Sequence, residues 1–543
     1  MNVLFASTDY VEPGRSSTGL PNYLRRISTA LSDNGHTAVI VYGSVYNEHR
    51  FDGNVEIYSV RVPVTAIDET IESVRIKTRC LITGYYINKK IDILLSERDI
   101  DIIQFVSLAG IALFYNGMVP AVIRLSSYAK IAYESSYKTI SKDCVDVYSD
   151  LELKAGKHIG HVFGPSEMTA AAFEKDLGSS VDIIESPFKP LDELDDLIYN
   201  SYFFGKQYAL FFGKMYAEKG IREISEILER FLKINPDYYF GFVGGDSIVD
   251  GISAFSLVLE KAGAYADRVI ILSELKHDQL FSVVKHADFI VIPSYMENFS
   301  NACMEAMYYN GCVVATKDAG FEQLIENGKT GFLCNKMDSA NLLDTIDMIA
   351  KMEQDRKSII RLNAKKRIEK NDPNSIVDKL INYYKKVIET YNFKEKSVPN
   401  DYDKDFLEYI SDHSVIAYAI DDADKKYLNS RTLAVWTKRL ILDDDPIEKY
   451  FRDTSKTVAI YGLMELGRLL IDGLEKNRVS ISYTIDQNLE MRYKDYPIYL
   501  PTDHLPEVDV IVVTPIFYYE TIVVFLRNKI DTKIVSIEDL IMT

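Results

Sequence analysis

Short apolar runs rich in β-branched residues alternate with amphipathic segments along the first 190 residues of the chain. The run 2–7 is followed by a loop, by a helical pattern from about Pro21, and by a second apolar run at 37–43. Gly35 lies just past the helical pattern, where helices commonly end. A strand, a helix and a strand in this order form a βαβ unit with parallel strands. We therefore expect residues 1–190 to form a Rossmann-like, doubly wound α/β domain.

The same alternation restarts at Tyr208 and continues to about residue 391. The apolar runs predict buried strands with helical patterns between them, at 208–213, 238–245, 268–273, 287–294 and 311–316. A stretch at 183–196 that contains prolines and acidic residues separates the two patterns. We therefore expect a second Rossmann-like domain over 191–391. Because parallel sheets bind ligands at the carboxyl ends of their strands, two such sheets predict a binding cleft between them.

A third and shorter βαβ pattern occupies the end of the sequence. Residues 392–455 combine a charged stretch at 394–405 with helical segments, and we expect a helical, charged linker there. Residues 456–543 again alternate apolar runs with helical patterns, which predicts a smaller Rossmann-like domain. The predicted fold class is thus α/β, with two doubly wound parallel sheets facing a cleft and a third, smaller sheet.

The uncharged run 102–123 has 22 residues and is long enough to span a bilayer. Polar residues, glycines and a proline interrupt it, and they favour a buried strand, a short apolar helix and a second strand. Residues 1–8 lack the features of a signal peptide and predict a first strand. These patterns favour a cytoplasmic protein.

The net charge of the chain determines how the cleft could bind an anionic ligand. The 543 residues include 62 Lys and Arg against 80 Asp and Glu, a net charge of −18, and half of that charge lies in residues 401–543. This acidity argues against a nucleic-acid partner and against strong attachment to anionic lipid. A phosphate-bearing ligand therefore needs local cations. The five scattered cysteines form no CxxC pair, which argues against a disulfide framework or a zinc site and favours a reducing compartment.

A basic patch flanks the aromatic stretch 84–90 in the first domain. It consists of Arg75, Lys77, Arg79, Lys89 and Lys90. A solvated helix face explains these residues best. A peripheral contact with the inner face of the cell membrane is the alternative that the sequence leaves open.

The densest chemical signal is the block 293–334. Glu297 follows an apolar run in a loop, and Glu305 lies eight positions later on a predicted helix. A carboxylate one turn into a helix can accept both hydroxyls of a vicinal diol such as ribose. Backbone N–H groups in the loop and at the helix start can receive a phosphate or sugar hydroxyls. The residues that offer them are Asn298, Phe299, Ser300 and Asn301. Taken alone, two glutamates at this spacing are more often solvated surface charges.

Two lysines follow the first strand predicted in the second domain. Lys214 comes directly after Gly213 and Lys219 follows five positions later, so the two can converge on one diphosphate as point charges. Two exposed lysines at a strand end explain the pattern equally well. In the first domain, Gly19 permits close approach of the backbone to a ligand, although a plain turn between strand and helix also explains it.

The block 293–334 closely resembles the Glu-x7-Glu signature of retaining, GT-B-fold glycosyltransferases of family 4. The resemblance covers roughly residues 1–391. It implies that Glu305 binds the ribose of a nucleotide-sugar donor. It also implies that Glu297 and the loop 298–301 hold the donor sugar.

The segment 211–220 is similar to the diphosphate-binding pattern of this family, which implies that Lys214 and Lys219 bind the donor diphosphate. Lys214 stands where the family has an arginine, so the charge is kept and bidentate recognition is lost. The glycine-rich first loop of the family is also altered. Thr18 replaces one of its two glycines, and Gly19 supplies the other.

The strand end at 124–127 departs further from the family, because many relatives carry a histidine there and this sequence has none. A cation in the cleft is one interpretation of Arg124 that the sequence leaves open, but we expect it to be a salt-bridged structural residue. His158 and His161 precede the segment 164–170, which again resembles the family. We expect these two histidines to be packing or surface residues and not catalysts.

The last domain has glycines at the spacing of a dinucleotide-binding fingerprint. Gly462 and Gly467 occupy the outer positions and Asp486 ends the next strand, but Met464 replaces the middle glycine. A side chain there obstructs close approach of a pyrophosphate. The segment is similar to degenerate Rossmann-type extensions of some bacterial polysaccharide glycosyltransferases. We therefore favour a regulatory, docking or oligomerisation role over dinucleotide binding.

The resemblance implies a retaining glycosyltransferase that moves a sugar from a nucleotide-sugar donor, with UDP as the commonest carrier. The implied acceptor is a hydroxyl of a glycan or lipid-linked molecule in bacterial surface polysaccharide synthesis. No metal and no cofactor are implied, because lysines and a helix end stabilise the diphosphate. The alternatives are a non-catalytic glycosyltransferase-like scaffold and a GT-B nucleotide-sugar epimerase or phosphorylase. A homo-oligomer, or a partner protein bound through the last domain, is also left open.

Overall fold

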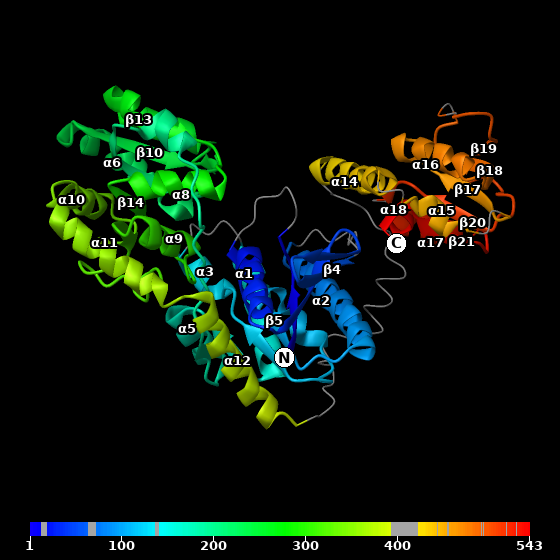
Figure 1. Ribbon diagram of the computed structural model, residues 1–543, viewed down its shortest axis with the longest axis horizontal. Helices are drawn as coiled ribbons and strands as arrows, with labels where there is room; N and C mark the ends of the chain where they lie inside the picture. The colour runs from blue at the N-terminus through cyan, green and yellow to red at the C-terminus, as the bar shows by residue number, and fades with distance from the viewer. Residues whose placement is uncertain are drawn as a thin grey trace. The chain divides into compact units, whose positions relative to one another are not determined.

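The computed structural model of the chain forms two compact units (Figure 1). The first unit contains residues 1–44, 49–60 and 71–399, and the second consists mainly of residues 400–543. The residues that the structure describes are 1–11, 19–62, 72–135, 141–392, 422–441, 444–452, 455–489, 491, 493–516, 519–527 and 529–542. Thr18 and the charged stretch 394–405 lie outside them.

An eight-stranded sheet opens the first unit, in the order β3-β4-β2-β1-β5-β6-β7-β8. From β2 to β8 neighbouring strands pair in parallel, and Val3 lies between Ala38 and Ile102. The strands are β1 (Asn2–Ser7), β2 (Thr37–Ser44), β3 (Glu48–Asp52), β4 (Val55–Arg61), β5 (Ile102–Val106), β6 (Ala121–Arg124), β7 (Val162–Gly164) and β8 (Asp182–Ile183). The helices are α1 (Gly19–Asp33), α2 (Glu72–Glu97), η1 (Leu108–Phe114), α3 (Ala129–Ser135), α4 (Lys142–Ile159) and α5 (Glu167–Leu177). The doubly wound first sheet is therefore confirmed.

The uncharged run 102–123 folds as β5, the short 3-10 helix η1 and β6, as its polar interruptions predicted. No described helix is long and apolar enough to cross a membrane. The aromatic stretch 84–90 lies on α2, where Tyr85 is buried against Phe114. Part of that stretch therefore belongs to the core of the first domain.

The second sheet has the order β13-β10-β9-β14-β15-β16, and all of its pairs are parallel. Its strands are β9 (Gln207–Phe212), β10 (Tyr238–Val243), β13 (Val269–Leu272), β14 (Phe289–Ile292), β15 (Val313–Thr316) and β16 (Phe332–Cys334). A small hairpin pairs β11 (Ile248–Val249) with β12 (Ile252–Ser253). The helices are η2 (Tyr199–Phe203), η3 (Ala217–Lys219), α6 (Ile221–Ile234), α7 (Ala254–Ala262), η4 (Gly263–Arg268), α8 (His277–His286), α9 (Asn301–Tyr309), α10 (Ser339–Ala350) and α11 (Gln354–Glu369). Both expected Rossmann-like sheets are thus present.

Helix α12 (Pro373–Thr390) packs with the first sheet, although we expected it to belong to the second domain, 191–391. Its buried face, which includes Ile376 and Leu380, joins the same core as Val3 on β1. The hydroxyl of Tyr384 also donates to Gln104 Oε1 on β5 at 2.6 Å. Figure 1 shows α12 leaving α11 and running beside the first domain. The apolar face of the helix, and not its place in the sequence, decides this position.

The second unit contains a five-stranded parallel sheet in the order β19-β18-β17-β20-β21, as expected for a smaller Rossmann-like domain. Its strands are β17 (Thr457–Tyr461), β18 (Ser480–Ile485), β19 (Ile498–Tyr499), β20 (Val510–Val513) and β21 (Lys533–Ser536). The helices are α14 (Asp422–Ile441), α15 (Pro446–Tyr450), α16 (Glu465–Lys476), α17 (Tyr519–Arg527) and α18 (Ile537–Met542). Trp436 and Ile447 pack in the core of this sheet, so part of the expected linker 392–455 contributes helices to it.

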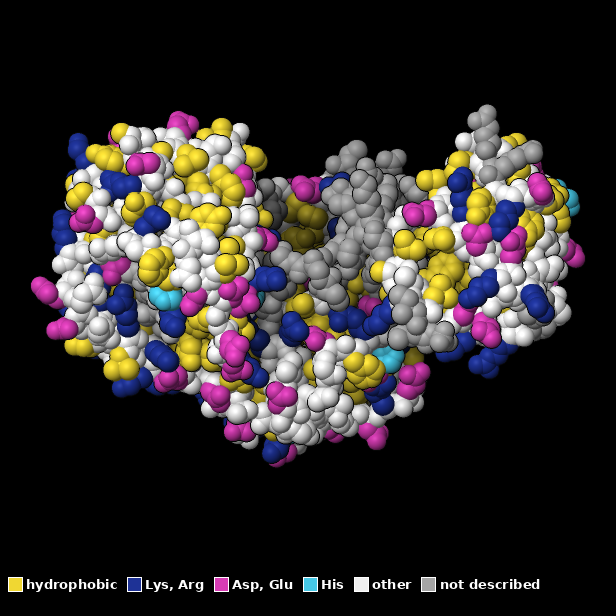
Figure 2. Space-filling view, turned by 45° about the horizontal axis from the view of Figure 1, so that its top comes forward, with side chains coloured by type: hydrophobic (Ala, Val, Ile, Leu, Met, Phe, Trp, Pro, Cys, Tyr) yellow, Lys and Arg dark blue, Asp and Glu magenta, His cyan; other side chains and the backbone are white. Residues whose placement is uncertain are grey.

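The surface carries charges of both signs. Figure 2 shows Lys and Arg side chains interspersed with Asp and Glu side chains over the visible face. On this face the excess of acidic residues is therefore dispersed, and a ligand meets a strong local charge only where a few side chains converge.

Candidate active site

A cleft of about 2310 Å³ lies between the two sheets of the first unit. The carboxyl ends of β6, β9 and β14 reach it, as the position of ligand sites in parallel sheets predicts. Every residue that the sequence singled out for the site lines this one cleft. These residues are Gly19, Gly213, Lys214, Lys219, Glu297, Asn298, Phe299, Ser300, Asn301 and Glu305.

Close backbone contacts place the loop that carries the lysines beside the loop that carries Glu297. Gly220 has a φ of +77°, and a Cβ atom there would lie 2.4 Å from the carbonyl oxygen of Pro293. Gly320, which lies in a third loop after β15, has a φ of +88°, and its Cβ would lie 2.2 Å from the carbonyl oxygen of Glu297. Only glycine accommodates both the left-handed backbone and these contacts. The two loops therefore meet, and Lys219 lies next to Glu297.

Lys219 and Glu297 form an ion pair in the cleft. Lys219 Nζ lies 2.5 Å from Glu297 Oε1, and the side chains are 34% and 17% exposed. Burial disfavours the lysine charge, but the adjacent carboxylate outweighs this and raises the pKa of Lys219, so the ammonium stays protonated. Lys219 has two further N–H donors for a phosphate, and Glu297 has a second oxygen for a sugar hydroxyl.

Lys214 lies exposed on the cleft wall, directly after Gly213. Its Nζ is 6.0 Å from the centre of the Tyr216 ring. Lys214 forms no ion pair with any residue in the described part of the chain. Its charge is therefore available to an anionic ligand, as the diphosphate hypothesis requires.

Helix α9 begins on the cleft with a complete N-cap. The hydroxyl of Ser300 accepts a hydrogen bond from the backbone N–H of Cys303. The side chain of Phe299 packs in the core of the second sheet, so only its backbone can meet a ligand. The positive end of the helix dipole lies in the cleft, where it favours an anion.

Asn298 joins the second domain to the first. Its Nδ2 donates to the carbonyl oxygens of Leu125 and Ser126 at 3.3 and 2.8 Å. Oδ1 of Asn298 and Oγ of Ser126 are buried and have no hydrogen-bond partner among the described residues. Because buried polar atoms are normally bonded, these two oxygens mark a place for the hydroxyl groups of a ligand.

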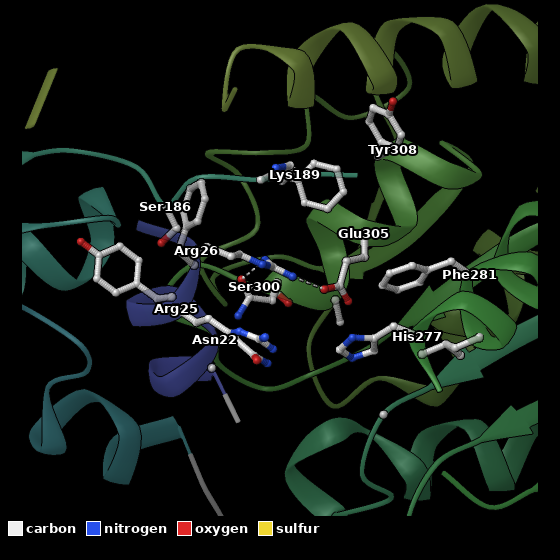
Figure 3. A pocket seen from close by; sticks show the side chains of 18 of the residues that line it. Asn22, Arg25, Arg26, Ser186, Lys189, His277, Phe281, Ser300, Glu305 and Tyr308 are labelled. Atoms are coloured by element: carbon white, nitrogen blue, oxygen red, sulfur yellow. Dashed lines mark hydrogen bonds and ion pairs between the residues drawn. The ribbon is translucent and has the colours of Figure 1, made fainter. Parts of the chain in front are cut away.

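Glu305 meets an arginine from the first domain that the sequence analysis did not single out. Arg26 Nη2 lies 2.9 Å from Glu305 Oε1, and its Nη1 donates to Asn301 Oδ1 at 3.3 Å. Figure 3 shows Arg26 extending from α1 to Glu305 on α9. A sequence signal exists, because Arg26 follows Gly19 by two helical turns and so shares its face of α1. At the other end of that face, a Cβ on Gly19 would lie 3.7 Å from Asn301 Nδ2.

Arg124 lines the cleft, but it is not the salt-bridged residue that we expected. Only 4% of it is exposed, and its guanidinium lies 3.4 Å from the centre of the Tyr23 ring. It donates to Ser186 Oγ at 2.9 Å and has no carboxylate partner among the described residues. Burial accordingly lowers the pKa of Arg124. The aromatic ring replaces the expected acidic partner.

Aromatic side chains form the wall on the other side of Glu305. His277 and Phe281, one turn apart on α8, stack with ring centres 5.3 Å apart, and Phe281 stacks on Tyr309 at 4.6 Å. Figure 3 shows both rings opposite Arg26. Flat rings of this kind can hold a nucleobase beside a ribose-binding carboxylate. Sequence analysis did not identify this wall, because a His and a Phe one turn apart are common on helices.

We also searched the described parts of the chain for a metal site and for a catalytic histidine. No group of three or more His, Cys, Asp or Glu side chains there could hold a metal ion. His158 Nε2 lies 2.8 Å from the carbonyl oxygen of Tyr115, which is a packing contact.

In the second unit, the backbone N–H of Leu463 donates to Asp486 Oδ2 at 2.8 Å. The carboxylate that a dinucleotide ribose would need is thus bonded within its own glycine loop. Met464 lies 70% exposed, so its side chain points away from the loop interior.

Residues 202–367 match the family model described as "Glycosyl transferases group 1". A D-inositol 3-phosphate glycosyltransferase from Corynebacterium diphtheriae is 29% identical over 145 residues, which are 26% of this chain and 33% of that protein. An alpha-D-kanosaminyltransferase from Streptomyces kanamyceticus is 26% identical over 141 residues, which are 26% of this chain and 35% of that protein. The chain thus spans about a third of the length of these curated relatives.

Solved structures match over a longer stretch. Sucrose-phosphate synthase from Thermosynechococcus elongatus superposes with a TM-score of 0.58 at 15% identity, over 72% of this chain and 100% of that one. A glycosyltransferase from Rickettsia africae superposes with a TM-score of 0.51 at 17% identity, over 72% and 99%. These likenesses show the fold, and the two sheets facing a cleft are the GT-B arrangement that the sequence predicted. Through residues 202–367 the chain is thus similar to the glycosyl transferases group 1 family.

Proposed function

We propose that this cleft binds a nucleotide sugar and transfers its glycosyl group, with retention of configuration, to a hydroxyl of a glycan or lipid-linked acceptor. One observation carries the proposal. Two cation–carboxylate pairs, Lys219–Glu297 and Arg26–Glu305, converge with the start of α9 in one cleft between two parallel sheets. The family match and the glycosyltransferase relatives support the same chemistry.

Each part of a donor has a complementary group in the cleft. Glu305 accepts the ribose hydroxyls, Lys214, Lys219 and the start of α9 bind the diphosphate, and Glu297 with Asn298 binds the sugar hydroxyls. In the transfer, the bond between sugar C1 and the phosphate oxygen breaks, a bond from C1 to the acceptor oxygen forms, and the acceptor hydroxyl gives its proton to the departing phosphate oxygen. Negative charge grows on the leaving diphosphate, and fixed cations and helix N–H groups stabilise it. Exclusion of water from the cleft suppresses hydrolysis of the donor.

The finer assignments follow from the resemblance to family 4. We propose UDP as the donor nucleotide, a reaction that needs no metal, and a role in bacterial surface polysaccharide synthesis. The reaction then takes place in the cytoplasm or at the inner face of the cell membrane. Lys214 and Lys219 would supply the charge that a metal supplies in other transferases.

A ligand screen with product analysis tests the proposal. The full chain is heated with UDP-, GDP- and ADP-sugars, and a ligand at 100 times its dissociation constant should add about 2.7 kcal/mol to the stability. Release of the nucleoside diphosphate is then measured with an added sugar acceptor, with and without EDTA. Absence of any thermal shift would favour the non-catalytic scaffold. Conversion of the donor without an acceptor, or only with phosphate, would favour the epimerase or the phosphorylase.

For the second unit we propose docking or oligomerisation, because Asp486 is already bonded within the glycine loop. Light scattering on the full chain distinguishes a homo-oligomer from a monomer. Nucleotide binding that is lost in Asp486→Ala and kept in Lys219→Met would contradict this assignment.

A further inference from the structure

Arg26 spans the part of α9 along which a donor must lie. Its Nη1 bonds Asn301, the first residue of the helix, and its Nη2 bonds Glu305, one turn later. In the proposed function the helix start receives a phosphate, and Glu305 receives the ribose. The guanidinium therefore lies beside the segment that joins the ribose to the diphosphate.

The guanidinium is held in place but keeps donors for a ligand. The Arg26 side chain is 20% exposed, and its carbon Cζ lies 5.8 Å from the centre of the Phe188 ring, which belongs to the core of the second sheet. A guanidinium has five N–H groups, and the hydrogen bonds to α9 use two of them. Its Nε has no hydrogen-bond partner among the residues that the structure describes. The remaining N–H groups can therefore bind an anion while the ion pair persists.

Electrostatics favour retention of this pair when a diphosphate enters. If Arg26 left Glu305, two carboxylates, Glu297 and Glu305, would face the phosphates of the donor with fewer cations between them. Like charges in a shielded cleft repel strongly. A guanidinium that stays between Glu305 and a phosphate attracts both of them. Arg26 also offers the planar, bidentate geometry that is missing at Lys214.

We propose that Arg26 is a donor-binding residue contributed by the first domain. It stays bonded to Glu305 and donates its remaining N–H groups to a phosphate of a nucleoside diphosphate. The donor is then held by cations from both domains, Arg26 on one side and Lys214 and Lys219 on the other. This inference rests on the proposed function, since it assigns a role at the same donor site.

Calorimetric titration of the full chain tests the inference. Wild-type protein is titrated with UDP, GDP and ADP, and the diphosphate that binds is compared with its nucleoside. Arg26→Met should weaken binding of the diphosphate about tenfold or more and change binding of the nucleoside less than about threefold, because only the diphosphate carries the anion. Arg26→Lys should recover part of the loss. Arg98→Met is the matched control, because Arg98 forms an ion pair with Glu56 in the same domain and does not line the cleft.

The outcomes separate this inference from the proposed function. A wild-type protein that binds no nucleotide would overturn both. A wild-type protein that binds, with Arg26→Met binding as tightly or more tightly, would overturn the inference alone and show that Arg26 competes with the ribose for Glu305. An equal loss for diphosphate and nucleoside would also overturn it, since Arg26 would then only position Glu305. Thermal unfolding of each variant confirms that the loss is not due to misfolding.

Discussion

Lys219 Nζ lies 2.5 Å from Glu297 Oε1, which joins the loop after β9 to the loop after β14. The lysine is the cation proposed for the diphosphate, and the glutamate is the acceptor proposed for the sugar. Because the two charges neutralise each other within the cleft, removal of either leaves the other without its partner. The bond cleaved in the proposed reaction joins the two parts of the donor that these residues would hold.

Lys219→Met should reduce the transfer rate about 100-fold, because one fixed positive charge on the leaving diphosphate is lost. The free energy of unfolding should fall by about 1 kcal/mol, since the pair is only partly shielded from water. Steady-state transfer assays and urea unfolding measure the two effects. Lys219→Arg keeps the charge and should retain more activity. Wild-type turnover in Lys219→Met would show that the lysine does not contact the donor.

Gly220→Ala should misplace Lys219. A Cβ there would lie 2.4 Å from the carbonyl oxygen of Pro293, in a backbone conformation with a φ of +77°. Gly35→Ala is the matched control, because Gly35 has a φ of +78° and no atom within 4 Å of its Cβ position. We expect Gly35→Ala to cost about 1 kcal/mol of unfolding free energy from the backbone conformation alone. Gly220→Ala should cost about 2 kcal/mol more and also weaken nucleotide binding. If urea unfolding shows the same loss of unfolding free energy in both variants, the loop that carries Gly220 shifts freely to accommodate the new Cβ atom.

The sequence predicted that these cleft-lining residues lie together because they follow strand ends. Glu297, Lys214 and Gly19 each come shortly after a run of buried apolar residues, and parallel strands bring their carboxyl ends to one edge. The spacing of Glu297 and Glu305 fixed which carboxylate lies in the loop and which on α9. These relations are local along the chain, so the sequence pattern and the family resemblance were enough to predict that these residues lie in one cleft.

The remaining features depend on contacts between distant segments. Arg26 meets Glu305 across 279 positions, and only its place two helical turns after Gly19 distinguishes it from Arg25 in the sequence. Arg124 was expected to pair with an acid, but the ring that covers it belongs to Tyr23 on α1. Helix α12 was assigned to the second domain because it follows α11, whereas its apolar face packs with the first. Each of these outcomes is decided by packing between segments that are distant in the sequence, which a linear pattern does not contain.

Glu305→Gln should weaken binding of a ribonucleoside diphosphate about tenfold, because a charge-assisted hydrogen bond to the ribose is lost. The affinity for the 2′,3′-dideoxy analogue should stay within about twofold, since that ligand has no hydroxyls to donate. Calorimetric titration of both ligands measures the contrast. Glu226→Gln is the control, because Glu226 does not line the cleft and accepts a hydrogen bond from Ser339. An equal loss for both ligands would place the ribose elsewhere.

Glu152 gives the fold a pH dependence that is separate from the cleft. It is buried on α4, where Oε2 accepts a hydrogen bond from the backbone N–H of Ala129 at 3.2 Å. Burial raises the pKa of Glu152 from 4.5 to about 8. Between these two pH values the folded chain holds a proton that the unfolded chain has lost. The contribution of Glu152 to stability is therefore complete below about pH 4.5 and is lost as the pH rises through about 8.

Glu152→Gln should remove this dependence, because an amide keeps the oxygen that accepts from Ala129 and cannot ionise. In the wild-type protein, the free energy of unfolding that is lost at pH 8 because of Glu152 is at most on the order of 4 kcal/mol. The N–H groups of the introduced glutamine lack hydrogen-bond partners in this site, which costs about 1–2 kcal/mol. This cost offsets part of the stability gained at pH 8 by removing the ionisable carboxyl. We therefore expect Glu152→Gln to be more stable than the wild type by about 2 kcal/mol at pH 8 and to lose this advantage at pH 5. Urea unfolding at the two pH values measures the difference. A stability difference that is the same at both would mean that Glu152 ionises in the folded chain as readily as in water.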